Sequence, residues 1–155
     1  MKLLVAAVGK VRKSYLREGC EDYFRRIRKM TPIDVKEVKP AGGNNPSTAL
    51  KTEGKKIRTL LDGLNGWKIA AATDKGKTLT SNKFAELLGK VENGGATGMV
   101  IVVGGAWGLD EEVVARADYK IGFGPMTMSH ELARLVLFEQ IYRAQTILRG
   151  VPYSK

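Results

Sequence analysis

The sequence is poor in the residues that build crosslinks and metal sites. Its 155 residues include one cysteine, Cys20, and one histidine, His130. A single cysteine excludes an internal disulfide, and together with a single histidine it argues against a zinc site. No apolar run approaches the roughly 20 residues that a membrane span needs, and the apolar start is too short for a signal peptide. We therefore expect a cytoplasmic protein without a metal or a membrane segment.

Acidic residues are scarce relative to basic ones. Lysine and arginine total 26 against 16 aspartates and glutamates, so the net charge is +10. This balance favours a polyanionic partner, usually nucleic acid, although a solvated lysine-rich surface gives the same charge. Basic residues gather in the last turns of the first predicted helix, as an RNA-facing patch or as a solvated helix end. This first-helix basic patch consists of Arg25, Arg26, Arg28 and Lys29.

Apolar strands and amphipathic helices alternate along the chain. This order predicts a single α/β domain over residues 1–155, with a mostly parallel sheet and helices on both faces. The predicted strands are 2–8, 33–39, 67–73, 99–103 and 119–123. The predicted helices are 15–30, 48–64, a short one capped by Thr80 and Ser81, 110–117 and 130–149. Residues 40–47 are expected to form a loop, and residues 74–77 a turn.

A glycine loop follows the predicted strand 99–103. Three of its five residues are Gly104, Gly105 and Gly108, and Asp110 stands where a helix N-cap is expected. The spacing is neither the GxGxxG dinucleotide fingerprint nor a phosphate-binding P-loop, and no nucleophile elbow is present. A cofactor site and a tight structural turn both remain open.

The last predicted helix is apolar on more than one face. A helix with apolar residues on nearly every face must be buried on nearly every face, and packing against one small sheet rarely buries a helix so fully. This pattern indicates a partner subunit.

Several motifs together resemble one known family. They are GGAWGLDEEV, the block MTMSHELARLVLFEQIYRAQTILRG, the terminal PYSK and the start KLLVAAVGK. Their combination resembles the ribosomal RNA large subunit methyltransferase H family, which belongs to the SPOUT superfamily of knotted methyltransferases. The resemblance covers the whole chain, although no single motif is specific.

The resemblance implies an S-adenosylmethionine-dependent methyltransferase that needs no metal. Its implied substrate is pseudouridine 1915 of 23S ribosomal RNA, methylated at N3 in the assembled ribosome. It also implies a homodimer with the site at the subunit interface, and a C-terminal trefoil knot. The alternative is a basic RNA-binding or ribosome-binding module of the same fold that has lost catalysis.

Three segments of the resemblance imply cofactor binding. Glycine lets backbone groups approach an adenosine closely, and methionine offers polarizable surface. Without the resemblance, Met126 and Met128 are interpreted as core residues. The implied cofactor residues are Thr73, Gly104, Gly105, Phe123, Gly124, Pro125, Met126, Thr127 and Met128.

Two further residues are candidates for catalysis or RNA positioning. Arg143 lies in the Tyr-Arg-Ala motif and could donate to phosphate or base oxygens, or form a dimer salt bridge. Tyr153 lies in the tail motif and could stack on a base, or belong to a frayed terminus. His130 fits either a structural role at a helix start or a proton shuttle.

The sequence departs from the family pattern at three positions. Ser154 replaces the usual tail histidine, Ser129 replaces the usual proline, and Thr73 replaces a residue that is often leucine. The first departure argues against a mechanism in which a tail histidine acts as the base.

Overall fold

The computed structural model describes residues 1–153, and Ser154 lies outside them. Five parallel strands form one sheet in the order β2-β1-β4-β3-β5. The strands are β1 (Lys2–Val8), β2 (Ile33–Val38), β3 (Trp67–Thr78), β4 (Gly98–Val103) and β5 (Tyr119–Gly122). The helices are α1 (Ser14–Arg28), α2 (Pro46–Asp62), α3 (Ser81–Asn93), α4 (Glu111–Ala115) and α5 (His130–Leu148). The predicted α/β class is confirmed.

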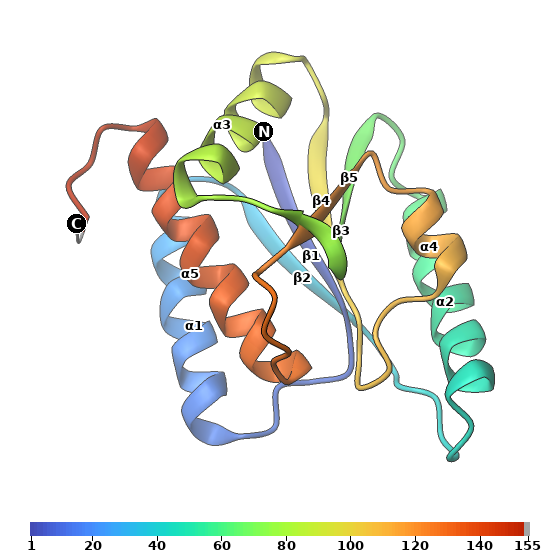
Figure 1. Cartoon of the computed structure of the whole chain (residues 1–155). Helices are drawn as coiled ribbons and strands as arrows, with labels where there is room; N and C mark the ends of the chain where they lie inside the picture. Colours follow the sequence, from blue (N-terminus) through green and yellow to red (C-terminus); the bar gives the residue numbers. More distant parts are fainter. Residues whose placement is uncertain (154–155) are drawn as a thin grey trace.

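The central strands are apolar on both faces because helices cover both faces (Figure 1). Alternate residues of β1 point to opposite sides, as the two-residue period of a strand requires. Leu3, Val5 and Ala7 pack with α1, α3 and α5. Leu4 and Ala6 belong to the second core, which α2 and α4 cover. The sheet is therefore the middle layer of three.

The turn predicted at residues 74–77 is wrong. β3 continues through this stretch to Thr78, and β5 pairs with it on both sides of an irregularity: Ile121 lies opposite both Ala72 and Lys77. A Cβ atom at Gly76 would lie 2.4 Å from the backbone carbonyl carbon of Ile121. Turn-forming residues therefore become strand because β5 passes close against them. This crossing is compatible with the trefoil knot, which stays a prediction.

The start of α2 also differs from the prediction. The helix begins at Pro46 instead of Thr48, because the Asn45 side chain accepts a hydrogen bond from the Thr48 backbone N–H over 3.2 Å. Proline suits the first helical position, where no backbone N–H is needed. The Asn-Pro pair inside the predicted loop was thus a helix start.

Helix α5 is covered within one subunit more fully than its sequence suggested. It lies between α1 and α3 on one face of the sheet (Figure 1). Leu137, Phe138 and Ile141 are buried in the subunit's own core. Leu132 and Ile147 remain about two-fifths exposed, at 40% and 42%. The apolar residues around α5 are therefore weaker support for a partner subunit than we expected from the sequence. Within residues 1–153, no helix has the length and apolar character needed to cross a membrane.

Candidate functional site

The three predicted cofactor segments meet at the carboxyl edge of the sheet. Gly104 follows the end of β4, and Thr73 comes one residue after Ala72, which pairs with Val103. The third segment begins at Phe123, directly after β5. A Cβ atom at Gly122 would lie 3.3 Å from the Thr73 carbonyl oxygen. The structure therefore brings these segments together where open α/β sheets bind ligands.

The glycine loop is a tight turn. A Cβ atom at Gly104 would lie 2.3 Å from the Gly108 carbonyl oxygen, and Gly108 has a φ of +85°. The Gly108 N–H donates a hydrogen bond to the Gly105 carbonyl oxygen over 3.1 Å. The structural-turn interpretation thus accounts for Gly104 and Gly108. Gly105 differs, because a Cβ there would meet the side chains of Val8, at 3.0 Å, and Glu53, at 3.7 Å.

The third segment runs over the surface from Phe123 to Ser129. Met126 is 83% exposed, so the core interpretation of this methionine is wrong. The Ser129 hydroxyl accepts a hydrogen bond from the Leu132 N–H over 3.3 Å and caps α5. Serine in place of proline therefore preserves a defined helix start. His130 is the first residue of α5, half-buried, and not the cap.

Thr73 has a role that leucine could not fill. Its hydroxyl donates to the Asp74 carboxylate over 3.3 Å and accepts from the Lys75 N–H over 3.4 Å. These bonds hold the irregular stretch of β3 at the point where β5 passes it. The side chain is therefore engaged within β3, which leaves the Thr73 backbone as the group able to face a ligand.

A cavity of about 720 Å³ adjoins the glycine loop. It lies at the carboxyl ends of β1 and β2, against the start of α5, and Glu53, Trp107 and His130 line it. Glu53 is only 5% exposed. Sequence reasoning missed Glu53, although it follows Leu50 by three residues and precedes Ile57 by four. That spacing places a carboxylate on the apolar face of α2 and was the available signal.

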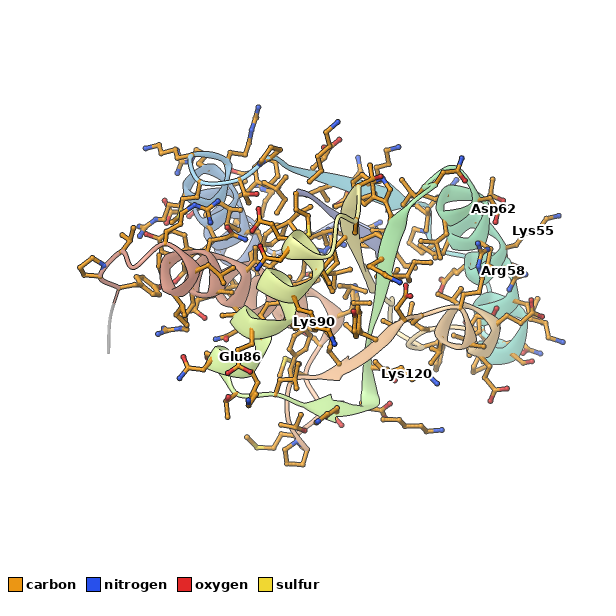
Figure 2. The ribbon with its side chains drawn as sticks, turned by 90° about the horizontal axis from the view of Figure 1, so that it is seen from above. Lys55, Arg58, Asp62, Glu86, Lys90 and Lys120 are labelled. Atoms are coloured by element: carbon orange, nitrogen blue, oxygen red, sulfur yellow. The ribbon has the colours of Figure 1, made fainter. Side chains whose placement is uncertain are left out.

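Asp110 is the N-cap residue of α4, as predicted, but its side chain makes no capping hydrogen bond. Its carboxylate accepts a hydrogen bond from Arg58 over 2.6 Å, and Arg58 also lies 2.9 Å from Glu112. In Figure 2, Lys55 extends outward from α2, whereas Arg58 lies on the side of α2 next to α4. The Asp110 carboxylate thus binds the Arg58 guanidinium instead of the first backbone N–H groups of α4, and this ion pair connects α4 to α2.

Arg143 and Tyr153 lie together at the other end of α5. The Arg143 guanidinium carbon is 4.7 Å from the Tyr153 ring centre, and Glu139 pairs with Arg143 at 2.6 Å. The Tyr153 ring also contacts Tyr142 edge-on, with centres 4.8 Å apart, and its hydroxyl lies 3.2 Å from that of Tyr23. Burial, followed by the hydrogen bond with Tyr23, raises the pKa of Tyr153. Tyr153 is therefore packed rather than frayed.

The first-helix basic patch borders this cluster. Arg25 and Arg26 both pair with Asp22, at 3.4 and 2.8 Å. The Arg26 guanidinium also lies 5.8 Å from the Tyr142 ring centre, and Arg28 lies as far from Phe24. The patch is exposed and continuous with the tail residues. Both the phosphate-facing and the solvated interpretations fit an exposed patch.

Arg143 and the glycine loop lie toward opposite ends of α5 within one subunit. Arg143 follows His130 by 13 residues on α5, which corresponds to about 20 Å along the helix at 1.5 Å per residue. His130, at the start of α5, lines the same cavity as Gly105 of the glycine loop. Figure 1 shows the end of β4 at the edge of the sheet where α5 begins. Arg143 therefore lies about 20 Å along α5 from the helix end that borders the glycine loop.

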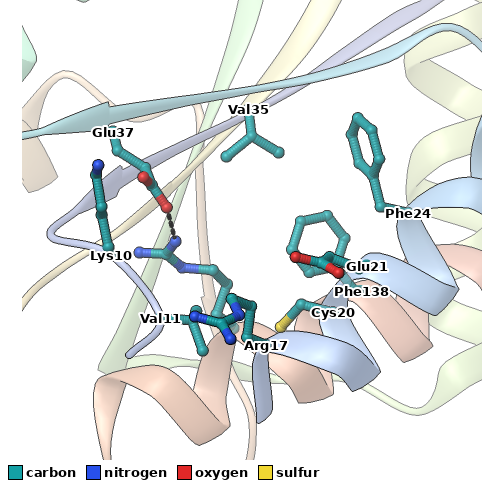
Figure 3. A pocket seen from close by; sticks show the side chains of 10 residues that line it. Lys10, Val11, Arg17, Cys20, Glu21, Phe24, Val35, Glu37 and Phe138 are labelled. Carbon is teal, nitrogen blue, oxygen red and sulfur yellow. Dashed lines mark hydrogen bonds and ion pairs between the residues drawn. The ribbon is translucent and has the colours of Figure 1, made fainter. Parts of the chain in front are cut away.

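A smaller cavity of about 310 Å³ lies between α1, β2 and α5. Figure 3 shows Cys20, Val35 and Phe138 around it. Arg134 closes its polar end, where it pairs with Glu37 and donates to the Gly9 carbonyl oxygen over 2.7 Å. Burial raises the pKa of Cys20 to about 11. This thiol is protonated and unreactive at neutral pH. Among residues 1–153, no group of three or more His, Cys, Asp or Glu side chains could hold a metal ion.

Comparison with known proteins identifies the family. The family model described as "Predicted SPOUT methyltransferase" matches residues 1–154. The chain is 38% identical over 161 residues to "Ribosomal RNA large subunit methyltransferase H" of Lactococcus lactis subsp. cremoris, with all of both chains covered. It is 37% identical over 159 residues to the protein of that name from Carboxydothermus hydrogenoformans, again with complete coverage. The relative from Geobacter metallireducens is 34% identical, with 99% of this chain and 98% of its own covered.

A solved structure supports the fold. A probable methylase family protein from Haemophilus influenzae superposes with a TM-score of 0.58. The match covers 99% of this chain and 70% of the other, at 12% sequence identity, so it bears on the fold alone. With the family match over the whole described chain, these comparisons show that the chain belongs to the SPOUT methyltransferase family and is a methyltransferase.

Proposed function

We propose that this methyltransferase uses S-adenosylmethionine to methylate N3 of a pseudouridine in 23S ribosomal RNA, in the assembled ribosome and hence in the cytoplasm. The observation that carries this proposal is full-length identity of 34–38% to relatives named for large subunit ribosomal RNA. The convergence of the three predicted cofactor segments at one edge of the sheet and the net charge of +10 agree with it.

The residues at this edge fit S-adenosylmethionine. The Thr73 backbone, the glycine loop and the surface segment 123–128 border one region, and Met126 presents 83% of its surface there for contact with a ligand. When bound, S-adenosylmethionine supplies a methyl group on an electrophilic sulfonium, so no metal is required. The task of these residues is to bind and orient, which is the main contribution that a protein makes to such a transfer.

The target RNA is bound by a second group of residues in this proposal. Arg143 stands about 20 Å along α5 from His130, which lines the same cavity as the glycine loop of its own subunit, and Tyr153 packs against Arg143. We therefore assign them to the active site of a partner subunit in a homodimer, where Arg143 positions a phosphate or base oxygen and Tyr153 stacks on an unpaired base. The exposed apolar residues Leu132 and Ile147 on α5 offer surface for that contact.

The proposal is tested in two steps. Titration calorimetry of the purified protein with S-adenosylmethionine, in the presence of EDTA, should show binding without metal. Ribosomes from cells that lack the protein should then gain one methyl group on a 23S pseudouridine, located by mass spectrometry of nuclease fragments. Ribosome binding without cofactor binding or methyl transfer would instead establish the alternative, an inactive RNA-binding module.

A further inference from the structure

The large cavity beside the glycine loop contains a buried acceptor without a partner. The Glu53 atom Oε1 accepts a hydrogen bond from the Ala41 N–H over 3.0 Å. The other carboxyl oxygen, Oε2, is buried and has no hydrogen-bond partner among the described residues. Buried polar atoms are nearly always satisfied, so an unsatisfied one calls for an explanation. An N–H group of a bound molecule would supply the missing donor.

The rest of the cavity has the chemistry of a nucleotide site. Trp107 is 48% exposed at the cavity and offers a flat ring for stacking. Lys10, Arg12 and Lys39 are exposed basic residues in the lining, suited to phosphates. A Cβ at Gly105 would lie 3.7 Å from Glu53 Oε2, so the glycine leaves no side chain between the glycine loop and this buried oxygen. An aromatic ring, an unpaired acceptor and basic residues together match an unpaired base on an RNA strand.

We propose that Glu53 is a specificity-determining residue that accepts a hydrogen bond from the ring N1–H of the target pseudouridine while the base stacks on Trp107. This inference rests on the proposed function. Pseudouridine carries two ring N–H groups, N1–H and N3–H, whereas the N1 atom of uridine is bonded to the ribose. With N3 as the methyl acceptor, N1–H is the ring donor that remains for the protein. Glu53 therefore distinguishes pseudouridine from uridine, and Gly105 joins this base pocket to the cofactor segments.

The chain offers a direct reporter of base binding. It contains two tryptophans, Trp67 and Trp107, so W67F leaves Trp107 as the single tryptophan. We expect pseudouridine 5′-monophosphate to quench its fluorescence at about tenfold lower concentration than uridine 5′-monophosphate, the scale of one hydrogen bond to a charged group. In W67F/E53Q this ratio should fall toward one. E53Q keeps a side-chain oxygen for the Ala41 N–H and should melt near the wild-type temperature.

Matched variants and a second measurement separate the possible outcomes. E86Q removes an exposed carboxylate on α3 and should keep the tenfold preference. Single-turnover methyl transfer to ribosomes should slow about tenfold in both E53Q and W107L, with unchanged affinity for S-adenosylmethionine. W107L tests the pocket independently because its side chain is half exposed.

Four results would overturn the inference. They are equal quenching by the two nucleotides, no quenching by either, wild-type transfer rates in both variants, or loss of S-adenosylhomocysteine binding in E53Q. The last result would assign the pocket to the adenine of the cofactor. If the wild-type protein methylates ribosomes and both E53Q and W107L transfer methyl groups at the wild-type rate, only the proposed base pocket is refuted. Wild-type protein that transfers no methyl group to ribosomes refutes the proposed function.

Discussion

A shared active site can be tested by mixing two inactive variants. The first variant is R143A, which removes the guanidinium beside Tyr153. The second is G105L, which fills the glycine loop. A Cβ at Gly105 meets side chains and no backbone, Val8 at 3.0 Å and Glu53 at 3.7 Å, so the change requires a small shift of the Val8 side chain. Gly104 is unsuitable, because a Cβ there would strike the backbone of Gly108. Each variant alone should be folded and inactive.

The expected recovery follows from the geometry. Arg143 lies about 20 Å along α5 from His130, which borders the glycine loop of its own chain. If the site joins the loop of one subunit to Arg143 of the other, a heterodimer contains one intact site and one doubly defective site. Random mixing of equal amounts makes about half of the dimers heterodimers. Activity should therefore recover to roughly a quarter of the wild-type value per subunit.

The assay is methyl transfer to ribosomes from co-expressed variants that carry different affinity tags. Purification through both tags isolates the heterodimer, which should reach about half of the wild-type activity because one of its two sites is intact. Calorimetry must first show that R143A binds S-adenosylmethionine and that G105L does not. A double variant carrying both changes on one chain, paired with wild type, is the control. Activity of the mixture that stays at the level of the separate variants would refute the shared site.

Three further predictions concern charge, the buried thiol and the glycine loop. Replacing the three arginines of the first-helix basic patch with glutamate should weaken ribosome binding and flatten its salt dependence, without changing cofactor affinity in calorimetry; unchanged binding in a filter assay would make the patch a solvated helix end. Iodoacetamide at pH 8 should alkylate Cys20 about a hundredfold more slowly in native than in urea-unfolded protein, because burial raises its pKa to about 11. Because the Cys20 thiol has a higher pKa in the folded than in the unfolded protein, its protonated form stabilises the fold below about pH 8.5, and this stabilisation is lost as the pH rises through 11. Equal alkylation rates in native and unfolded protein would contradict the raised pKa. Gly104→Val should lower the free energy of unfolding in urea by about 1–3 kcal/mol, since its Cβ would lie 2.3 Å from a backbone oxygen; an unchanged midpoint would show that the loop opens freely.

Sequence patterns were sufficient where burial alone decides structure. The strand predicted over residues 2–8 matches β1, because an uninterrupted apolar run of that length is stable only inside a sheet covered on both faces. The helix with apolar residues at Leu16, Cys20 and Ile27 was found for the same reason, since those side chains share one face. The family motifs likewise predicted three cofactor segments, which the fold brings to one edge.

Sequence patterns did not predict local structure correctly where backbone or a charged side chain from a distant part of the sequence determines it. Asp110 is the N-cap residue of α4 as predicted, but its carboxylate accepts from Arg58, which lies 52 residues earlier, instead of capping the helix. Residues 74–77 have turn chemistry and become strand because β5 pairs across them. Glu53 carries no motif, and its unpartnered oxygen is visible only once α2, the glycine loop and Ala41 enclose it.

Local periodicity thus determined which segments are strands and helices and which faces they bury, because each depends on neighbours a few residues away. Tertiary structure alone decided that the predicted cofactor segments meet at the carboxyl edge, that Tyr153 packs against Arg143 in the second half of α5, and that Glu53 and Trp107 line one cavity. These facts depend on the order of strands in the sheet and on the length of α5. Contacts between residues that are distant in the sequence produce no local hydrophobic periodicity, so sequence patterns do not reveal them.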